Sequence, residues 1–239
     1  MQIIFIRHAD PDYANDSLTE KGKREAALLA KRVASWKDIT QFYVSPLGRA
    51  QMTAAPSLQA AGREAICLHW LREVAAGVKM PDGRPHIGWD FMPASWTTWP
   101  EFYDRDKWVD APIMRTGDMA HEWDYIHTSL DNLLRDYGYR REGGCYKVEK
   151  HSDARIVVFC HMGVTLFMLG HLLNISPMLM IHGFDIPPTG VTMLSSEERE
   201  EGTAYFRVHA LGDCRHLYEG NEKLSQSGYF APLFQEVAD

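Results

Sequence analysis

The chain opens with an apolar run that stops abruptly at an arginine and a histidine. Residues 3–6 have the length and the β-branched and aromatic composition of a buried strand, and Arg7 and His8 follow at its C-terminal end. Ligands of open α/β sheets bind beyond the carboxyl ends of the strands. An imidazole placed there can attack phosphorus, and a guanidinium can hold phosphoryl oxygens through its planar fork. The alternative is a strand followed by two solvated polar residues.

A second strand-to-helix junction places another arginine beside a strand end. Residues 42–44 have the composition of a buried strand, and Ser45 is the predicted N-cap of a helix from 47 to about 61 that ends at Gly62. Arg49 lies in the first turn of this helix, where the dipole favours an anion. A cation there is unfavourable as a plain surface residue and is more easily explained if it faces a phosphate.

A third junction ends in a second histidine. Residues 156–160 form an apolar strand, His161 follows it, and Gly163 is expected to let the backbone turn into an apolar helix over 164–173. A lone histidine at a strand end is usually structural. Two of them, on parallel strands that end at one edge and accompanied by two arginines, can converge on one pocket, with His8 or His161 as nucleophile and the other as hydrogen-bond donor.

Strands and helices alternate along the chain, which predicts a three-layer α/β/α sandwich with a mostly parallel central sheet. A helix is predicted over about 119–137, where Trp123, Ile126, Leu130, Leu133 and Leu134 recur at helical spacing, and residues 137–149 are predicted to form a hairpin. The charged stretch 195–202 is expected to be a solvated loop between two closing strands. The remaining elements are a helix over about 18–36 and strands at about 66–68, 191–194 and 205–208.

Four blocks in this order resemble the histidine phosphatase superfamily, which includes the cofactor-dependent phosphoglycerate mutases and many phosphomonoesterases. They are Arg7-His8, the L-T-x-x-G segment within 16–26, the S-P-L-x-R-x-x-x-T block over 45–53, and the C-H-M-G turn over 160–163. The resemblance covers roughly residues 1–75 and 150–195 and favours the phosphatase branch. Each block alone is weak, but the ordered set is specific.

The resemblance implies roles for these residues. His8 would carry a phosphohistidine, and Arg7, Arg49 and His161 would form the phosphate pocket. The sequence departs from the family pattern where R-H-G reads R-H-A, so that Ala9 must accept the backbone geometry of a glycine. It departs again where a methionine follows His161.

Release of an alkoxide from a phosphate monoester also needs a proton donor. Glu73, which follows an apolar stretch and matches the family's L-x-E setting, is the predicted general acid, and its pKa must then be raised by burial or by nearby phosphate. The alternative is a surface glutamate paired with Arg72. Asp10 and Asp12 are rival acids that could instead orient an imidazole or a loop.

The segment at about 79–118 has no sustained periodicity and holds four of the seven tryptophans. A stretch this long inside one domain is usually a functional lid or a binding loop, so we expect a cap that selects the leaving group. A small aromatic satellite core is the structural alternative. Trp96 and Trp99 are candidates to pack on substrate, and cations that could meet an extra anionic group are Arg84, Arg105, Lys107 and Arg115.

Length, net charge and cysteine content indicate the class of protein and its expected cellular location. The length of 239 residues suits one domain with this cap insertion, and the net charge of −7 argues against nucleic acid or an anionic membrane as partner. The four cysteines have no C-x-x-C spacing, and Cys67 and Cys160 fall in apolar strands, where we expect them reduced and buried. Because the first strand begins within ten residues of Met1, we expect no signal peptide, and no apolar run reaches membrane-spanning length. A cytoplasmic location follows as an expectation.

The sequence therefore predicts a phosphomonoester hydrolase that acts on a small phosphorylated metabolite and needs no metal or cofactor. A mutase of the phosphoglycerate mutase type is the first alternative. It is disfavoured because the stretch after His8 lacks the mutase tryptophan, and Asn15 stands one position late. A catalytically silent binding or regulatory module is the second alternative. The substrate and the oligomeric state are left open.

Overall fold

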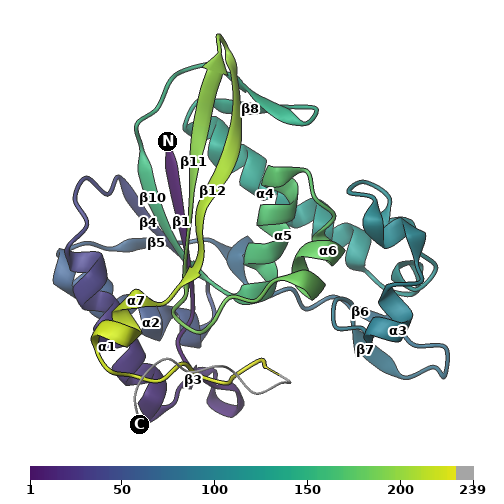
Figure 1. The fold of residues 1–239 in the computed structure, drawn as a ribbon, viewed down its shortest axis with the longest axis horizontal. Coiled ribbons are helices and arrows are strands. Elements are labelled where there is room, and N and C mark those ends of the chain that lie inside the picture. Colours follow the sequence, from purple (N-terminus) through teal and green to yellow (C-terminus); the bar gives the residue numbers. More distant parts are fainter. Residues whose placement is uncertain (230–239) are drawn as a thin grey trace.

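An eight-stranded sheet forms the centre of the computed structural model, which describes residues 1–229 (Figure 1). Its strand order is β5-β4-β10-β1-β11-β12-β9-β8. The strands are β1 (Gln2–Arg7), β4 (Gln41–Val44), β5 (Ala65–Cys67), β8 (Tyr139–Glu142), β9 (Cys145–Val148), β10 (Arg155–Cys160), β11 (Val191–Glu200) and β12 (Thr203–Asp213). Two small ribbons pair β2 (Pro11–Asp12) with β3 (Ser17–Leu18), and β6 (Gly77–Lys79) with β7 (Pro85–Ile87).

Helices cover both faces of the sheet. They are α1 (Glu20–Ala34), α2 (Gly48–Ala61), α3 (Pro93–Trp96), α4 (Met119–Asp136), α5 (Met162–Leu173), α6 (Pro177–Gly183) and α7 (Arg215–Glu219). Alternate residues of β1 point to opposite faces. Ile4 and Ile6 pack in one cluster with Leu29 of α1, whereas Ile3 and Phe5 belong to the larger cluster that contains α4 and α5. The predicted α/β sandwich is confirmed.

Parallel pairing is concentrated in the part of the sheet where the sequence predicts the site. β5, β4, β10 and β1 pair in parallel, and β11, β12, β9 and β8 extend the sheet with antiparallel pairs. Arg7 is the register partner of Cys160, and Val44 is the partner of Phe159. The carboxyl ends of β1, β10 and β4 therefore lie side by side at one edge, as the strand-end histidines require.

Most predicted elements are confirmed, and two local predictions are wrong. Ser45 does not cap α2: Leu47 is the N-cap residue and makes no side-chain cap bond, although Gly62 ends the helix in the left-handed conformation as expected. Residues 195–200 are not a solvated loop. They continue β11, which forms with β12 the long hairpin that projects at the top of Figure 1. Charged residues can occupy such strands because the hairpin extends beyond the helices that cover the sheet.

The burial prediction for the cysteines is half right. Cys160 is buried in the central strand β10, but Cys67 is exposed. β5 is the edge strand of the sheet, and Ile66 beside Cys67 is itself half exposed. An apolar strand at an edge has only one neighbouring strand, so its composition alone does not bury it. All four cysteines are free thiols.

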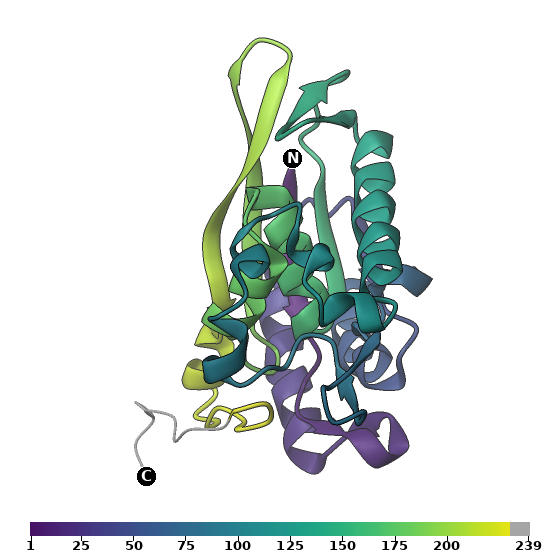
Figure 2. The same cartoon turned by 90° about the vertical axis from the view of Figure 1, so that its right-hand side faces the viewer.

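The segment at about 79–118 folds as short turns around an aromatic cluster. It contains β7, α3 and three turns of 3-10 helix, and Figure 2 shows it passing in front of α5 and α6. Phe102 and Trp108 are fully buried in the larger core cluster. Within residues 1–229, every helix is too short or too polar to cross a bilayer.

Candidate active site

His8 and His161 meet at the carboxyl edge of the parallel strands. Each follows its strand directly, and their rings lie 5.1 Å apart between centroids. Both side chains are buried, with 2% of His8 and none of His161 exposed. The structure thus brings together the two histidines that the sequence singled out.

The hydrogen bond of His8 fixes which nitrogen can react. Nδ1 lies 2.8 Å from the carbonyl oxygen of Ala9. A carbonyl only accepts, so Nδ1 carries the proton and Nε2 keeps a free lone pair. Burial, and then the charge of Arg7, lower the pKa of His8 to about 3. The imidazole is therefore neutral near pH 7, which is the state a nucleophile needs.

Ala9 accommodates the departure from the R-H-G pattern without strain. It is not among the residues with positive φ, so its backbone needs no conformation reserved for glycine. Its side chain is fully buried, and its N–H donates to Thr53 Oγ1 at 2.9 Å. That bond ties the loop after β1 to α2.

His161 presents a hydrogen-bond donor. Its Nε2 lies 2.7 Å from Ser45 Oγ, and Ser45 Oγ already accepts from the Leu47 N–H at 3.3 Å. Within residues 1–229 the Ser45 hydroxyl has no other acceptor for its own proton, so we assign that proton to the bond with Nε2, which leaves the proton of the ring on Nδ1. This Nδ1 is buried and has no partner among the described residues. Burial and the nearby cationic side chains hold the pKa of His161 well below its usual value.

The two arginines each keep one buried N–H unused. Arg7 donates through Nη1 to the Ile186 carbonyl at 2.6 Å and through Nη2 to the Ser227 carbonyl at 3.2 Å. Arg49 donates through Nη1 to Asp16 Oδ1 at 2.7 Å. In both side chains, the buried Nε has no partner within residues 1–229. A buried N–H without an acceptor lowers the stability of the fold, so these donors favour the binding of an anionic ligand.

Asp16 is a site residue that the sequence reasoning missed. Its carboxylate accepts from the Gly48 N–H at 2.6 Å and pairs with Arg49. It thus provides an anion at the N-terminus of α2, where we expected only a phosphate. Asp16 lies 32 residues before Gly48, and the ribbon of β2 and β3 brings it there. No local sequence signal marks such a contact.

Glu73 sits at the N-terminus of α5. Its Oε1 accepts from the N–H groups of Val164 at 2.9 Å and Val74 at 3.0 Å, and its Oε2 accepts from Gly163 at 3.1 Å. Burial raises the pKa of the carboxyl, although these three bonds oppose the shift. Arg72 does not pair with it, because its guanidinium binds Glu122 at 2.7 Å.

Gly163 has a role other than the one predicted. It lies inside α5 with ordinary φ, so it does not serve as a turn. A Cβ at this position would stand 2.7 Å from Glu73 Oε1. The glycine therefore permits the close approach of the carboxylate, which would have to shift if a side chain were present.

The rival carboxylates hold loops together. Asp10 accepts from the Thr19 hydroxyl at 2.5 Å and from the Ser225 hydroxyl, and Asp12 caps the turn of 3-10 helix at 13–15. These contacts match the orienting role that the sequence left open for them.

The cap candidates lie in different environments. Trp96 stacks on His182 at 4.8 Å, and Trp99 packs edge-on against Phe91. Arg84 and Arg115 are exposed and pair with Asp82 and Asp110. A cleft of about 530 Å³ beside Arg49 and Glu73 is lined instead by another part of the same segment, Pro85, His86 and Ile87. Its other walls are Leu47, Val74, Ala75 and Gly77.

The chain is similar to known proteins in part of its sequence and in its fold. Residues 3–109 match the family model of the histidine phosphatase superfamily (branch 1), and no curated protein matches the chain. A mycobacterial glucosyl-3-phosphoglycerate phosphatase is 18% identical, with a TM-score of 0.59 over 88% of this chain and 98% of that one. The α-ribazole phosphatase of Shigella flexneri is 16% identical, with a TM-score of 0.57 over 90% and 97%. The phosphoserine phosphatase of Entamoeba histolytica, solved with 3-phosphoglyceric acid, is 18% identical, with a TM-score of 0.58 over 90% and 98%.

Proposed function

We propose that this chain belongs to the histidine phosphatase superfamily, which its matched segment and its fold support, and that it hydrolyses phosphate monoesters through a phosphohistidine at His8. One observation carries the proposal. A neutral, buried imidazole with a free Nε2 stands among three buried N–H donors that have no partner within residues 1–229, on Arg7, Arg49 and His161. This is an electron-pair donor beside a preorganised set of hydrogen-bond donors for an oxyanion.

In the first step, Nε2 of His8 attacks phosphorus in line with the ester oxygen. The N–P bond forms as the P–O bond to the organic group breaks. Glu73 delivers its proton to the departing oxygen, so an alcohol leaves and a carboxylate remains. Arg7, Arg49 and His161 stabilise the negative charge on the equatorial phosphoryl oxygens. Removing one such preorganised donor typically costs about 10²–10³ in kcat.

In the second step, the Glu73 carboxylate takes a proton from water. The water oxygen attacks phosphorus, the N–P bond breaks, and its electron pair returns to His8 Nε2. Inorganic phosphate leaves, and Glu73 is protonated again for the next turnover. The burial that raises the pKa of Glu73 supports both roles, because the group must hold a proton in one step and accept one in the other.

The cleft beside Glu73 supports a substrate whose organic part carries little charge. Val74, Pro85 and Ile87 give it apolar walls, and Arg49, the one arginine or lysine among its lining residues, is assigned to the phosphoryl group. Selection by Trp96, Trp99, Arg84 or Arg115 remains a prediction, since none of these residues lines this cleft.

Product analysis tests the proposal against its alternatives. The purified chain is assayed with p-nitrophenyl phosphate, a panel of phosphometabolites, and 3-phosphoglycerate with its bisphosphate primer. Release of inorganic phosphate alone supports hydrolysis. An isomerised phosphoglycerate would instead show a mutase, and absence of both products across the panel would leave a binding or regulatory module.

A further inference from the structure

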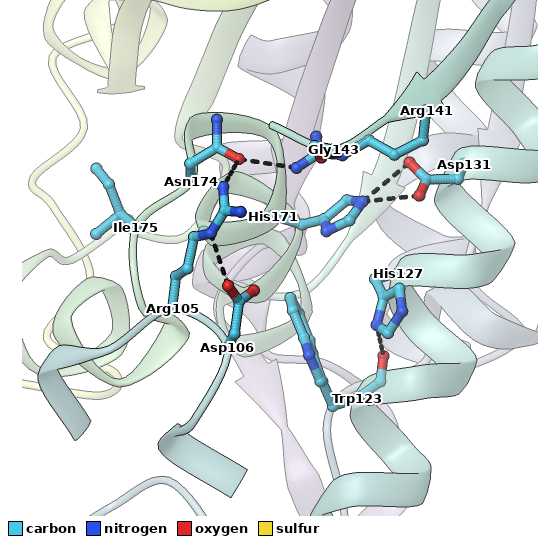
Figure 3. A pocket seen from close by; sticks show the side chains of 11 residues that line it. Arg105, Asp106, Trp123, His127, Asp131, Arg141, Gly143, His171, Asn174 and Ile175 are labelled. Atoms are coloured by element: carbon cyan, nitrogen blue, oxygen red, sulfur yellow. Dashed lines mark hydrogen bonds and ion pairs between the residues drawn. The ribbon is translucent and has the colours of Figure 1, made fainter. Parts of the chain in front are cut away.

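A second polar cavity lies at the far end of α5 from His8 (Figure 3). Its volume is about 290 Å³, and its walls come from α4, α5, the turn between β8 and β9, and the loop at 105–106. Gly170, the first α5 residue that lines it, lies seven residues after Gly163, which contacts Glu73, a distance of about 11 Å at the rise of an α-helix, and no described residue lines both this cavity and the cleft beside Glu73. The cavity is therefore distinct from the cleft at the candidate active site.

Two arginines converge on one neutral oxygen in this cavity. Arg141 Nη2 and Arg105 Nη1 donate to Oδ1 of Asn174 at 2.8 and 2.5 Å. Figure 3 shows the two guanidinium groups approaching this amide from different elements. Asn174 is held in the left-handed conformation at the end of α5, and its Nδ2 donates to the Gly144 carbonyl. The uncharged amide compensates neither positive charge, and although Asp106 pairs with Arg105, no carboxylate within residues 1–229 pairs with Arg141, so an anion would stabilise the arrangement.

Arg141 has hydrogen-bonding capacity that the described residues do not use. Its Nε donates to the Gly143 carbonyl at 2.8 Å, and its guanidinium lies 5.0 Å from the centre of the Tyr146 ring. Its Nη1 is buried without a partner, and within residues 1–229 no carboxylate forms an ion pair with it. Its charge and one donor thus remain available.

The carboxylates at the cavity are already engaged. Asp131 accepts from the Tyr146 hydroxyl at 2.8 Å and lies 2.9 Å from His171 Nε2, and Asp106 pairs with Arg105 Nε at 3.0 Å. The C-terminal end of α5 favours a nearby cation through its dipole. That effect accounts for a positive charge at this end of the helix, but it supplies no acceptor for the buried Nη1 of Arg141.

We infer that this cavity is a second binding site, for a small tetrahedral oxyanion such as free phosphate or the phosphoryl group of a compact ester. Arg141 Nη1 and the Arg105 guanidinium would hold its oxygens, because planar forks suit such groups. Trp123 forms a wall of the cavity against which an organic group can pack. The volume equals that of about ten waters, which suits a compact ligand.

Isothermal titration calorimetry tests the site with inorganic phosphate and, separately, with phenylphosphonate, which cannot be hydrolysed as an ester. We expect the wild type to bind phosphate at two classes of site. Arg141→Gln and Arg105→Gln should each weaken one class about tenfold or more, since each removes a charge-assisted contact. Arg141→Lys keeps the charge but loses the fork, so it should be intermediate. Arg140→Gln, at the residue before Arg141, removes a guanidinium that pairs with Glu142 and Glu149; it is the matched control and should bind as the wild type does.

A variant at the other site separates this inference from the proposed function. Arg49→Gln should weaken the first class and spare the class that depends on Arg141. If the class of site that depends on Arg141 binds phenylphosphonate more tightly than phosphate, its occupant is a phosphate ester. If it binds phosphate more tightly, its occupant is free phosphate. If Arg141→Gln and Arg105→Gln, folded by circular dichroism, bind both anions as the wild type does, the inference is wrong.

Discussion

Replacing Gly163 with alanine should disable proton transfer to the leaving group while sparing the rest of the site. The new Cβ would lie 2.7 Å from Glu73 Oε1, and contacts below 3.0 Å essentially never occur. The carboxylate must move by about 0.7 Å to reach the 3.4 Å of an ordinary contact, which disrupts its bonds to the Gly163 and Val164 N–H groups. A misplacement on the order of 1 Å can cost about 10² in rate.

The assay compares two kinds of leaving group. For alkyl phosphates, Gly163→Ala should reduce kcat by about 10- to 100-fold, because these esters need a correctly placed acid. For p-nitrophenyl phosphate the loss should be only a few-fold, because nitrophenolate leaves without a proton. Gly183→Ala is the control, since a Cβ there meets nothing within 4 Å. An unchanged rate on alkyl phosphates, or an equal loss on both substrates, would refute the reasoning.

Three further predictions follow from the same geometry. Glu73→Gln should slow esters with poor leaving groups far more than p-nitrophenyl phosphate, and an equal loss on both would move the acid to another group such as Asp10 or Asp12. Trp96→Ala or Trp99→Ala should raise KM for the natural ester if the cap contacts it; a Tm lowered by a loss of about 3–5 kcal/mol with unchanged KM would make these tryptophans structural. The pKa of His8 is lowered from 6.5 to about 3, so as the pH falls the unfolded chain binds this proton before the folded chain does. The contribution of His8 to the free energy of unfolding is therefore fully present above pH 6.5 and is lost as the pH drops towards 3. Between pH 6.5 and 5, the free energy of unfolding of His8→Gln, measured with denaturant, should fall less steeply with decreasing pH than that of the wild type, by up to about 1.4 kcal/mol per pH unit. An identical pH dependence in the two proteins would contradict the lowered pKa.

The sequence predicts the positions of functional side chains best where they directly follow a strand. Parallel strands bring their carboxyl ends to one edge, so the sequence alone predicts that His8 after β1 and His161 after β10 meet. Glu73 could be placed near the pocket by the apolar stretch before it and by family resemblance, but its bond to the N-terminus of α5, ninety residues later, could not be predicted.

Contacts that depend on tertiary packing could not be predicted. The pairing of Asp16 with Arg49 depends on the turn built by β2 and β3, and the need for glycine at 163 arises from a side chain distant in sequence. Cys67 is exposed because β5 is an edge strand, a property of strand order rather than of composition. Periodicity reports which residues are apolar, whereas strand order decides which of them are covered.

A covalent phosphohistidine at His8 can be detected directly by mass-spectrometric mapping of the protein quenched during turnover. We expect a phosphorylated peptide that contains His8, labile to acid and stable to base. His8→Ala should lack this species and retain less than about a hundredth of wild-type turnover, since loss of a nucleophile costs several orders of magnitude. His151→Ala, which removes an exposed histidine paired with Glu198, should behave as the wild type does. Phosphate on another residue, or substantial turnover by His8→Ala, would contradict the account.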